Sequence, residues 1–219
     1  MDKEASEQKN FKTYTFIDAS NLFYGGLKSL GWKIDYYKLL NYLKRKYNAT
    51  EIFYFGGVEI HNFKYDYISN ETVPIVELEK YLINFIKEKA KIFNEAELLL
   101  LSRHLQRIKF YLKLQQFGYI LILKPVKLYE QEDGTTRRKA NCDVEMTFRM
   151  MMEKDNFDQA VILSGDGDFL PVLKHLRDID KNVVILARGS RTAREIRQFT
   201  GSNFRDFTRL KNYIKFDEK

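Results

Sequence analysis

Two aspartates, Asp166 and Asp168, directly follow an apolar run at residues 161–163 and alternate with glycines. The run is typical of a short buried strand, and Pro171 suits the first turn of a helix that begins near Asp168. Ligands bind at the carboxyl ends of the strands of a parallel α/β sheet, so these carboxylates could hold a cation there. A structural alternative stays open, in which Asp168 caps the helix and Asp166 is a turn residue.

Two more aspartates are predicted to reach the same edge of the sheet. Asp18 follows an expected strand at residues 13–17, and Asp143 opens an expected helix. In a sheet of order 3-2-1-4-5, the strand that ends at Asp18 lies beside the strand that precedes Asp166, and the switch point falls between them. The four carboxylates, Asp168 included, would then converge from three parts of the chain. Any one of them alone is more often a helix cap than a ligand.

Carboxylates gathered in one crevice repel one another and raise one another's pKa values unless a cation lies between them. Oxygen ligands without cysteine or histidine select hard ions, so the sequence predicts Mg²⁺ or Mn²⁺ as the cofactor. Such an ion can orient a phosphodiester, neutralise its developing charge and lower the pKa of a bound water. Ser20, Asn21 and Ser164 are neutral neighbours that could position water or phosphate oxygens.

Basic residues occur on both sides of the predicted acidic crevice. One group precedes Asp143, and a second follows the expected strand at residues 182–186. These side chains could hold the phosphates of a polyanion that has one phosphate at the metal, or they could be solvated surface charges. The candidates for contacts with the phosphate backbone of such a polyanion are Arg137, Arg138, Lys139, Arg188, Arg191 and Arg194.

The composition favours an anionic partner. The 219-residue chain has 37 lysines and arginines against 30 acidic residues, a formal net charge of +7. This balance indicates nucleic acid first and an acidic membrane surface second. The single Cys142 excludes an intrachain disulfide and a cysteine-rich zinc site. No apolar run approaches the ~20 residues of a membrane span, and the first residues lack the apolar core of a signal peptide, so we expect a cytoplasmic protein with no membrane partner.

The order of elements predicts an α/β fold with a mainly parallel sheet of five or six strands. Strands are expected at residues 13–17, 51–55, 119–123, 161–163 and 182–186, with a short edge strand within 204–210. The domain is expected to span residues 13–210, between a disordered tail at 1–12 and a C-terminal tail at 211–219. Residues 58–118 are expected to form a helical elaboration that could serve a homodimer.

Capping residues mark the expected helices. Asp35 can cap a helix at residues 36–47, while Asn94 and Glu97 match a capping box for a helix that Gly118 would end. A further helix is expected at residues 74–90, a hairpin flap within residues 126–139 and a short basic helix at residues 190–198. The helix that opens at Asp143 is expected to bury Val144, Phe148, Met151 and Met152.

Three blocks of this sequence resemble the signature blocks of the NYN domain, in its LabA-like branch, a family of the PIN-like nuclease superfamily. The blocks are residues 16–24 (FIDASNLFY), 139–146 (KANCDVEM) and 163–169 (LSGDGDF). The resemblance covers residues 13–210, nearly the whole chain. It implies a Rossmann-like α/β/α sandwich, a Mg²⁺ or Mn²⁺ site and RNA cleavage by metal-activated water.

The resemblance also implies roles for individual residues. The aspartates that the family would use as metal ligands, directly or through water, are Asp18, Asp143, Asp166 and Asp168, and the asparagine of the first block is Asn21. The chain departs from the family pattern at Ala140, where the middle block usually has glycine. It also departs in the length of residues 58–118, which bears on the substrate and the partner.

Other classes of protein compete with a metal-dependent endoribonuclease as interpretations of this sequence. A non-catalytic RNA-binding or scaffolding protein with the same fold is the main alternative. A phosphohydrolase of the haloacid-dehalogenase type needs an acid two residues after its nucleophilic aspartate, and Asp18 is followed by Ala19 and Ser20. A dinucleotide-binding protein is disfavoured because residues 165–168 lack the required glycine spacing and place acids where a pyrophosphate would lie.

Overall fold

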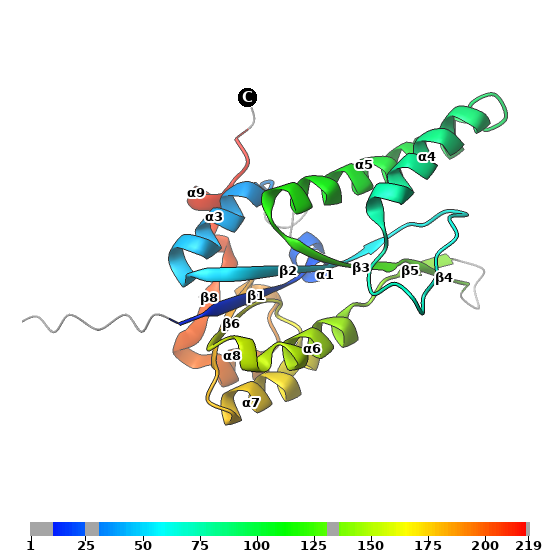
Figure 1. Ribbon diagram of the computed structural model, residues 1–219. Helices are drawn as coiled ribbons and strands as arrows, with labels where there is room; N and C mark the ends of the chain where they lie inside the picture. The colour runs from blue at the N-terminus through cyan, green and yellow to red at the C-terminus, as the bar shows by residue number, and fades with distance from the viewer. Residues whose placement is uncertain (1–10, 25–30, 131–135, 218–219) are drawn as a thin grey trace, which may run out of the picture.

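The fold is an α/β/α sandwich built on one six-stranded sheet (Figure 1). The computed structural model describes residues 11–24, 31–130 and 136–217. The strands lie in the order β3-β2-β1-β6-β7-β8 and pair in parallel, so the predicted order is confirmed, with the sixth strand next to β7. The strands are β1 (Thr13–Asp18), β2 (Ala49–Val58), β3 (Ile120–Pro125), β6 (Gln159–Leu163), β7 (Asn182–Ala187) and β8 (Phe204–Asp206).

Helices pack into two cores, one on each face of the sheet (Figure 1). The helices on one face are α1 (Ala19–Tyr24), α3 (Tyr36–Tyr47), α4 (Ile75–Lys89), α5 (Glu95–Phe117) and α9 (Lys211–Ile214). The helices on the other face are α6 (Asp143–Met152), α7 (Leu170–Asp178) and α8 (Arg194–Thr200). The expected flap is an antiparallel hairpin of β4 (Lys127–Glu130) and β5 (Thr136–Lys139).

Side chains of the central strands alternate between these two cores. Ile17 of β1 and Leu163 of β6 pack against the side that carries α3 and α5, whereas Phe16 and Ile162 pack against the side that carries α6 and α7. Strands buried on both faces need apolar residues at every position, which explains their near-continuous apolar sequence. The same burial leaves the strand ends as the places available for polar chemistry.

The expected caps are present. The Asp35 side chain accepts a hydrogen bond from the Lys38 amide and starts α3. Asn94 and Glu97 form a reciprocal capping box at the start of α5. Gly118 ends α5 at φ 104°, and its amide donates to carbonyl groups of the last turn. Local sequence therefore fixes where these helices begin and end.

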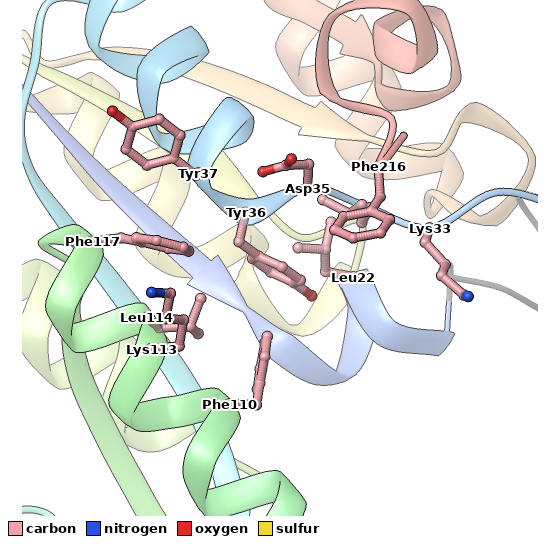
Figure 2. Close-up of a pocket in the computed structure, with 11 residues that line it drawn as sticks. Leu22, Lys33, Asp35, Tyr36, Tyr37, Phe110, Lys113, Leu114, Phe117 and Phe216 are labelled. Carbon is pink, nitrogen blue, oxygen red and sulfur yellow. The ribbon is translucent and has the colours of Figure 1, made fainter. Parts of the chain in front are cut away.

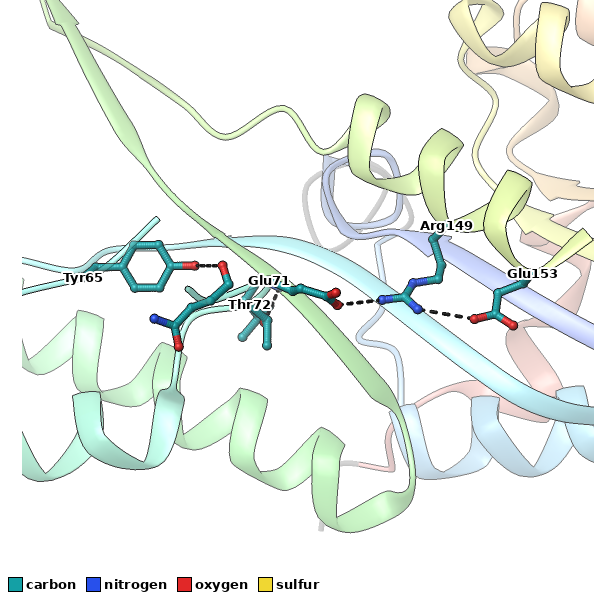
Figure 3. Close-up of polar contacts among 7 residues, drawn as sticks. Tyr65, Glu71, Thr72, Arg149 and Glu153 are labelled. Atoms are coloured by element: carbon teal, nitrogen blue, oxygen red, sulfur yellow. Dashed lines mark hydrogen bonds and ion pairs between the residues drawn. The ribbon is translucent and has the colours of Figure 1, made fainter. Parts of the chain in front are cut away.

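The outer edge of β3 is covered by the segment that precedes α4. The Leu123 amide donates to Thr72 Oγ1 at 2.8 Å, and the Val73 amide donates to the Leu123 carbonyl at 3.0 Å. Arg149 of α6 pairs with Glu71 at 3.1 Å across this edge (Figure 3). The two hydrogen bonds of Leu123 satisfy backbone groups that an edge strand would otherwise expose.

The prediction of which residues of α6 are buried was wrong. The helix buries Met146 and Met150. Residues two positions apart lie about 200° apart around a helix, so the expected residues fall on the other side. Val144, Phe148 and Met152 are 75, 61 and 61% exposed, and Met151 is only partly buried. Two apolar stripes with the same spacing compete in this segment, and the spacing alone does not select between them.

Two other expected boundaries also differ from the structure. The folded part continues past residue 210, because Ile214 of α9 is fully buried and its carbonyl accepts a hydrogen bond from the Asp35 amide at 2.8 Å. The basic segment at residues 190–198 contains a 3₁₀ turn, Gly189–Arg191, and α8 begins only at Arg194. Residues 1–10, the main part of the expected N-terminal tail, lie outside the described residues.

Replacing Gly118 with alanine is expected to lower the free energy of unfolding by about 1–2 kcal/mol, because a Cβ is strained at this positive φ. Urea denaturation would measure the loss. Gln116→Ala, at an exposed position in the last turn of the same helix, is the control and should change stability little. Equal stability of Gly118→Ala and the wild-type protein would contradict the assigned cap.

Candidate functional site

Three aspartates form an acidic cluster at the carboxyl edge of the sheet. One carboxylate oxygen from each of Asp143, Asp166 and Asp168 lies within 4.8 Å of the others. Asp143 is the first residue of α6, whereas Asp166 and Asp168 lie in the turn between β6 and α7. The structure therefore brings together three of the four predicted carboxylates from two separate segments.

Asp166 has a structural role as well as a place in the acidic cluster. Its Oδ1 accepts a hydrogen bond from the Asp168 amide at 3.0 Å and caps the 3₁₀ helix Gly167–Phe169. Its own amide donates to Ser164 Oγ at 3.3 Å. The structural alternative was thus correct that Asp166 is a turn residue. It was wrong that Asp168 caps the helix, because the N-cap of α7 is Phe169 and has no side-chain cap bond. The second oxygen of Asp166 takes no part in this capping bond.

Asp18 is the most constrained of the four aspartates. Its Oδ1 accepts hydrogen bonds from the Ser20 amide at 2.9 Å, the Ser20 hydroxyl at 2.6 Å and the Asn21 amide at 3.2 Å. Its Oδ2 accepts from the Ser164 hydroxyl at 3.1 Å. The side chain is only 7% exposed. Asp18 therefore holds the start of α1 and lies outside the acidic cluster.

A small polar pocket nevertheless joins Asp18 to Asp166. We call it the acidic pocket, and its volume is about 210 Å³. Its lining residues are Asp18, Ser20, Asn21, Asp166, Arg188 and Arg191. Aspartates and arginines thus line one opening, which is a set of residues suited to a phosphate held between a cation and arginines.

Only some of the predicted basic residues reach this site. Arg188 and Arg191 line the acidic pocket, while Arg194 is exposed at the start of α8 and is not among the lining residues. Burial and the neighbouring charge of Arg191 lower the pKa of Arg188, and Asp206 opposes this effect. The backbones of Arg137, Arg138 and Lys139 lie in β5, but their side chains are outside the described residues.

A close contact between two turns positions these arginines. The Ala193 amide donates to the Gly165 carbonyl at 2.9 Å, and Thr192 Oγ1 donates to the Arg188 carbonyl at 2.6 Å. A Cβ at Gly165 would come within 2.9 Å of the Thr192 backbone. Gly165 therefore allows the arginine turn to pack directly on the turn that carries the aspartates.

The electrostatics of the cluster are those of crowded carboxylates. Burial is the main effect that raises the pKa of Asp143, and the charges of Asp18, Asp166 and Asp168 raise it further, while a hydrogen bond with Asn141 lowers it. Asp143 therefore binds a proton more readily in the metal-free site than an isolated aspartate does. A cation would remove the repulsion, and an all-oxygen ligand set fits Mg²⁺ or Mn²⁺.

Cys142 is adjacent to the cluster but is not suited to nucleophilic chemistry. Burial, together with the charge of Glu145, raises the pKa of its thiol to about 12. At neutral pH the sulfur is therefore a thiol, which is a poor nucleophile. Within the part of the chain that the structure describes, no cysteine or histidine joins the three aspartates.

Sequence reasoning missed several residues that support the site. Lys124 of β3 contacts Glu145 Oε1 at 2.5 Å and the Asn141 carbonyl at 3.3 Å, which anchors the start of α6. Glu195 of α8 lies against Gly167, where it adds another carboxylate near the cluster. No local spacing signal marks Lys124 or Glu195, because both approach from elements distant in sequence.

Trp32 and Phe169 are packing residues rather than surfaces on which a base could stack. Trp32 is 5% exposed and stacks on Phe207, with ring centroids 6.3 Å apart. Phe169 is 1% exposed in the core beneath the cluster. The side chain of Tyr24 lies outside the described residues.

Substitution of Asp18 with alanine is expected to destabilise the protein by about 1–2 kcal/mol, because several donors at the start of α1 lose their acceptor. Chemical denaturation in the presence of a chelator would measure this loss without a metal contribution. Unchanged stability would show that Asp18 is not the structural cap that its contacts indicate.

Comparisons with known proteins agree with this architecture. Low amplitude and bright protein LabA of Synechococcus elongatus is 24% identical over 209 residues, which cover 93% of this chain and 88% of the relative. A crystal structure of a Vibrio parahaemolyticus protein of unknown function matches with a TM-score of 0.56 at 14% identity, over 93% of this chain and 94% of the other. That likeness shows a shared fold.

No helix in the described ranges is long and apolar enough to cross a membrane. The model of the NYN domain matches residues 12–206, a range that contains all four predicted aspartates and every strand of the main sheet. The chain belongs to the NYN domain family.

Proposed function

We propose that this NYN-domain protein is a metal-dependent endoribonuclease that hydrolyses RNA phosphodiester bonds. The acidic cluster carries the proposal, because three carboxylates from two segments bring oxygens within 4.8 Å of one another. Like charges this close are unfavourable unless a cation or a proton lies between them. Asp143, Asp166 and Asp168 would hold Mg²⁺ or Mn²⁺, and Asp18 would contribute directly or through water.

The remaining residues of the site would bind and orient the RNA. A bound divalent cation supplies Lewis acidity that offsets phosphate charge and lowers the pKa of bound water. Arg188 and Arg191 would contact a phosphate in the acidic pocket, where Ser20 and Asn21 would help to position it. Ser164 would act through Asp18, to which its hydroxyl donates. The choice of RNA as substrate follows from the family resemblance, and the net charge of +7 supports a polyanion.

The change Asp166→Asn is expected to lower the rate of RNA cleavage by at least ~100-fold, because it removes a cation ligand and a charge. An asparagine oxygen can still accept the Asp168 amide, so the turn is preserved. Labelled single-stranded and hairpin RNAs would be incubated with Mn²⁺, with Mg²⁺ and with a chelator. Cleavage should need a metal and should be lost in the variant.

Asp66→Asn is the matched control. Asp66 Oδ1 also accepts an amide hydrogen bond two residues ahead, from Ile68 at 2.9 Å, but it lies outside the cluster. This variant should cut RNA at the wild-type rate. Cleavage by Asp166→Asn at the wild-type rate would contradict the assignment of the site. If the wild-type protein binds RNA but does not cleave it with either metal, it is an RNA-binding protein without turnover.

The change Asp143→Asn is expected to stabilise the metal-free protein at neutral pH. A raised pKa in the folded state means that the ionised carboxylate opposes folding above that pKa, and this penalty disappears as the pH falls through it. The gain should be on the order of 1 kcal/mol or less, because the side chain is only partly buried. Thermal unfolding at neutral and acidic pH in chelator would measure it.

Manganese should reverse this order of stability. The wild-type protein gains stability from binding the ion to the native state, and the Asp143→Asn variant gains less. A variant that is less stable than the wild type in chelator as well as in manganese would show that Asp143 has a mainly structural role.

A further inference from the structure

A second, apolar pocket lies on the face of the sheet that carries α1, α3 and α5. Its volume is about 790 Å³, which is within the range of ligand sites. Figure 2 shows aromatic rings from α3, from α5 and from the C-terminal segment around one space. We call it the aromatic pocket; its rings are Tyr36, Tyr37, Phe110, Phe117 and Phe216.

Several of these rings are available to a ligand. Tyr37 is 54% exposed and Phe216 is 47% exposed. Tyr37 and Phe117 have ring centroids 5.2 Å apart, and Tyr36 packs on Phe110 at 5.0 Å. The backbone of Phe216 is held at the pocket because its amide donates to the Lys33 carbonyl at 2.9 Å. The pocket is thus a preformed set of aromatic surfaces rather than a loose group of side chains.

The charges at the aromatic pocket favour an anion. Lys33 and Lys113 are among its lining residues, and Lys113 Nζ lies 5.2 Å from the centre of the Phe117 ring. The acidic residue in the lining is Asp35, whose Oδ1 accepts the Lys38 amide as the cap of α3. An aromatic, anionic ligand would complement these rings and lysines, whereas a neutral aliphatic chain would use only the rings.

Helix α1 connects this pocket to the acidic pocket. Asn21 lines the acidic pocket, and the next residue, Leu22, lines the aromatic pocket. The helix has six residues and is therefore only about 9 Å long. One flexible strand with phosphates along its backbone could reach both pockets around α1.

We propose that the aromatic pocket stacks nucleobases of the single-stranded nucleic acid whose scissile phosphate occupies the acidic pocket. The inference rests on the proposed nuclease function and adds a base-binding subsite to it. Aromatic rings stack with every base, so this subsite would hold single strands without reading their sequence. Lys33 and Lys113 would contact the phosphates that flank the stacked bases.

The test is binding of a short single-stranded RNA that carries 2-aminopurine, whose fluorescence falls when the base stacks. The measurement uses the full chain in chelator, so that no cleavage is needed for a signal. The double variant Tyr37→Ala/Phe216→Ala is expected to bind about tenfold more weakly or worse and to lose the fluorescence quenching. Lys113→Gln should reduce the slope of log affinity against log salt concentration by about 1, which corresponds to the loss of one phosphate contact.

The matched control is Tyr67→Ala/Phe148→Ala, which removes two rings that are each 61% exposed and do not line the pocket. It should bind and quench like the wild-type protein, and thermal unfolding would check that both double variants are folded. Equal binding by the two double variants would overturn the proposal. Binding of the RNA to the wild-type protein without fluorescence quenching would also overturn it. An apolar dye that occupies the pocket and is not displaced by the RNA would do the same.

Failure of this proposal can be separated from failure of the nuclease assignment. If the RNA stacks in the pocket but is not cut with either metal, the base-binding subsite stands and the catalytic role falls. If Asp166→Asn abolishes cleavage while Tyr37→Ala/Phe216→Ala binds normally, the catalytic site stands and the base-binding subsite falls.

Discussion

The parallel pairing of β1 with β6 is the constraint on which the whole site depends. Residues 13–17 pair in register with residues 159–163, so the two strands end at the same edge of the sheet. The chain leaves β1 into α1 on one face and leaves β6 toward α7 on the opposite face. Because the two connections diverge, side chains at the strand ends face an opening rather than a core. The acidic cluster and the acidic pocket both lie at this divergence.

The carboxylate oxygens at this edge have two roles. Some accept hydrogen bonds that stabilise the local fold, and the others carry charge in the site. Both oxygens of Asp18 accept hydrogen bonds, whereas Asp166 commits Oδ1 to a cap. A carboxylate that must organise a turn is held in one orientation, so the same bonds that shape the turn also aim the remaining oxygen. The structural and functional interpretations of these residues therefore do not compete. Burial, together with the charges of the neighbouring carboxylates, raises the pKa of Asp143, and this is the energetic consequence of placing both functions in one crevice.

Most of the fold could be predicted from the sequence because its signals are local. Buried strands are short apolar runs, and caps such as Asp35 and Gly118 act within a few residues of themselves. Strand order also predicted that Asp18 and Asp166 lie at the same edge of the sheet, where they line the acidic pocket together. It did not predict that Asp18 lies outside the acidic cluster, because the hydrogen bonds of its carboxylate depend on the start of α1. The buried face of α6 could not be predicted, since two apolar stripes have equal spacing and only tertiary packing selects Met146 and Met150. The aromatic pocket was missed because Tyr37 and Phe216 lie far apart in sequence.

The two edges of the sheet limit how copies of this chain can associate. The outer edge of β3 already has partners in Thr72 and Val73, and β8 at the other edge has only three residues. Neither edge offers a long row of free backbone groups to another strand. Continuous strand addition is therefore a poor route to assembly, even when the protein is concentrated. Contacts between copies through the main sheet would have to be made by side chains, so they could evolve by surface substitution while the sheet and its carboxyl edge stay unchanged.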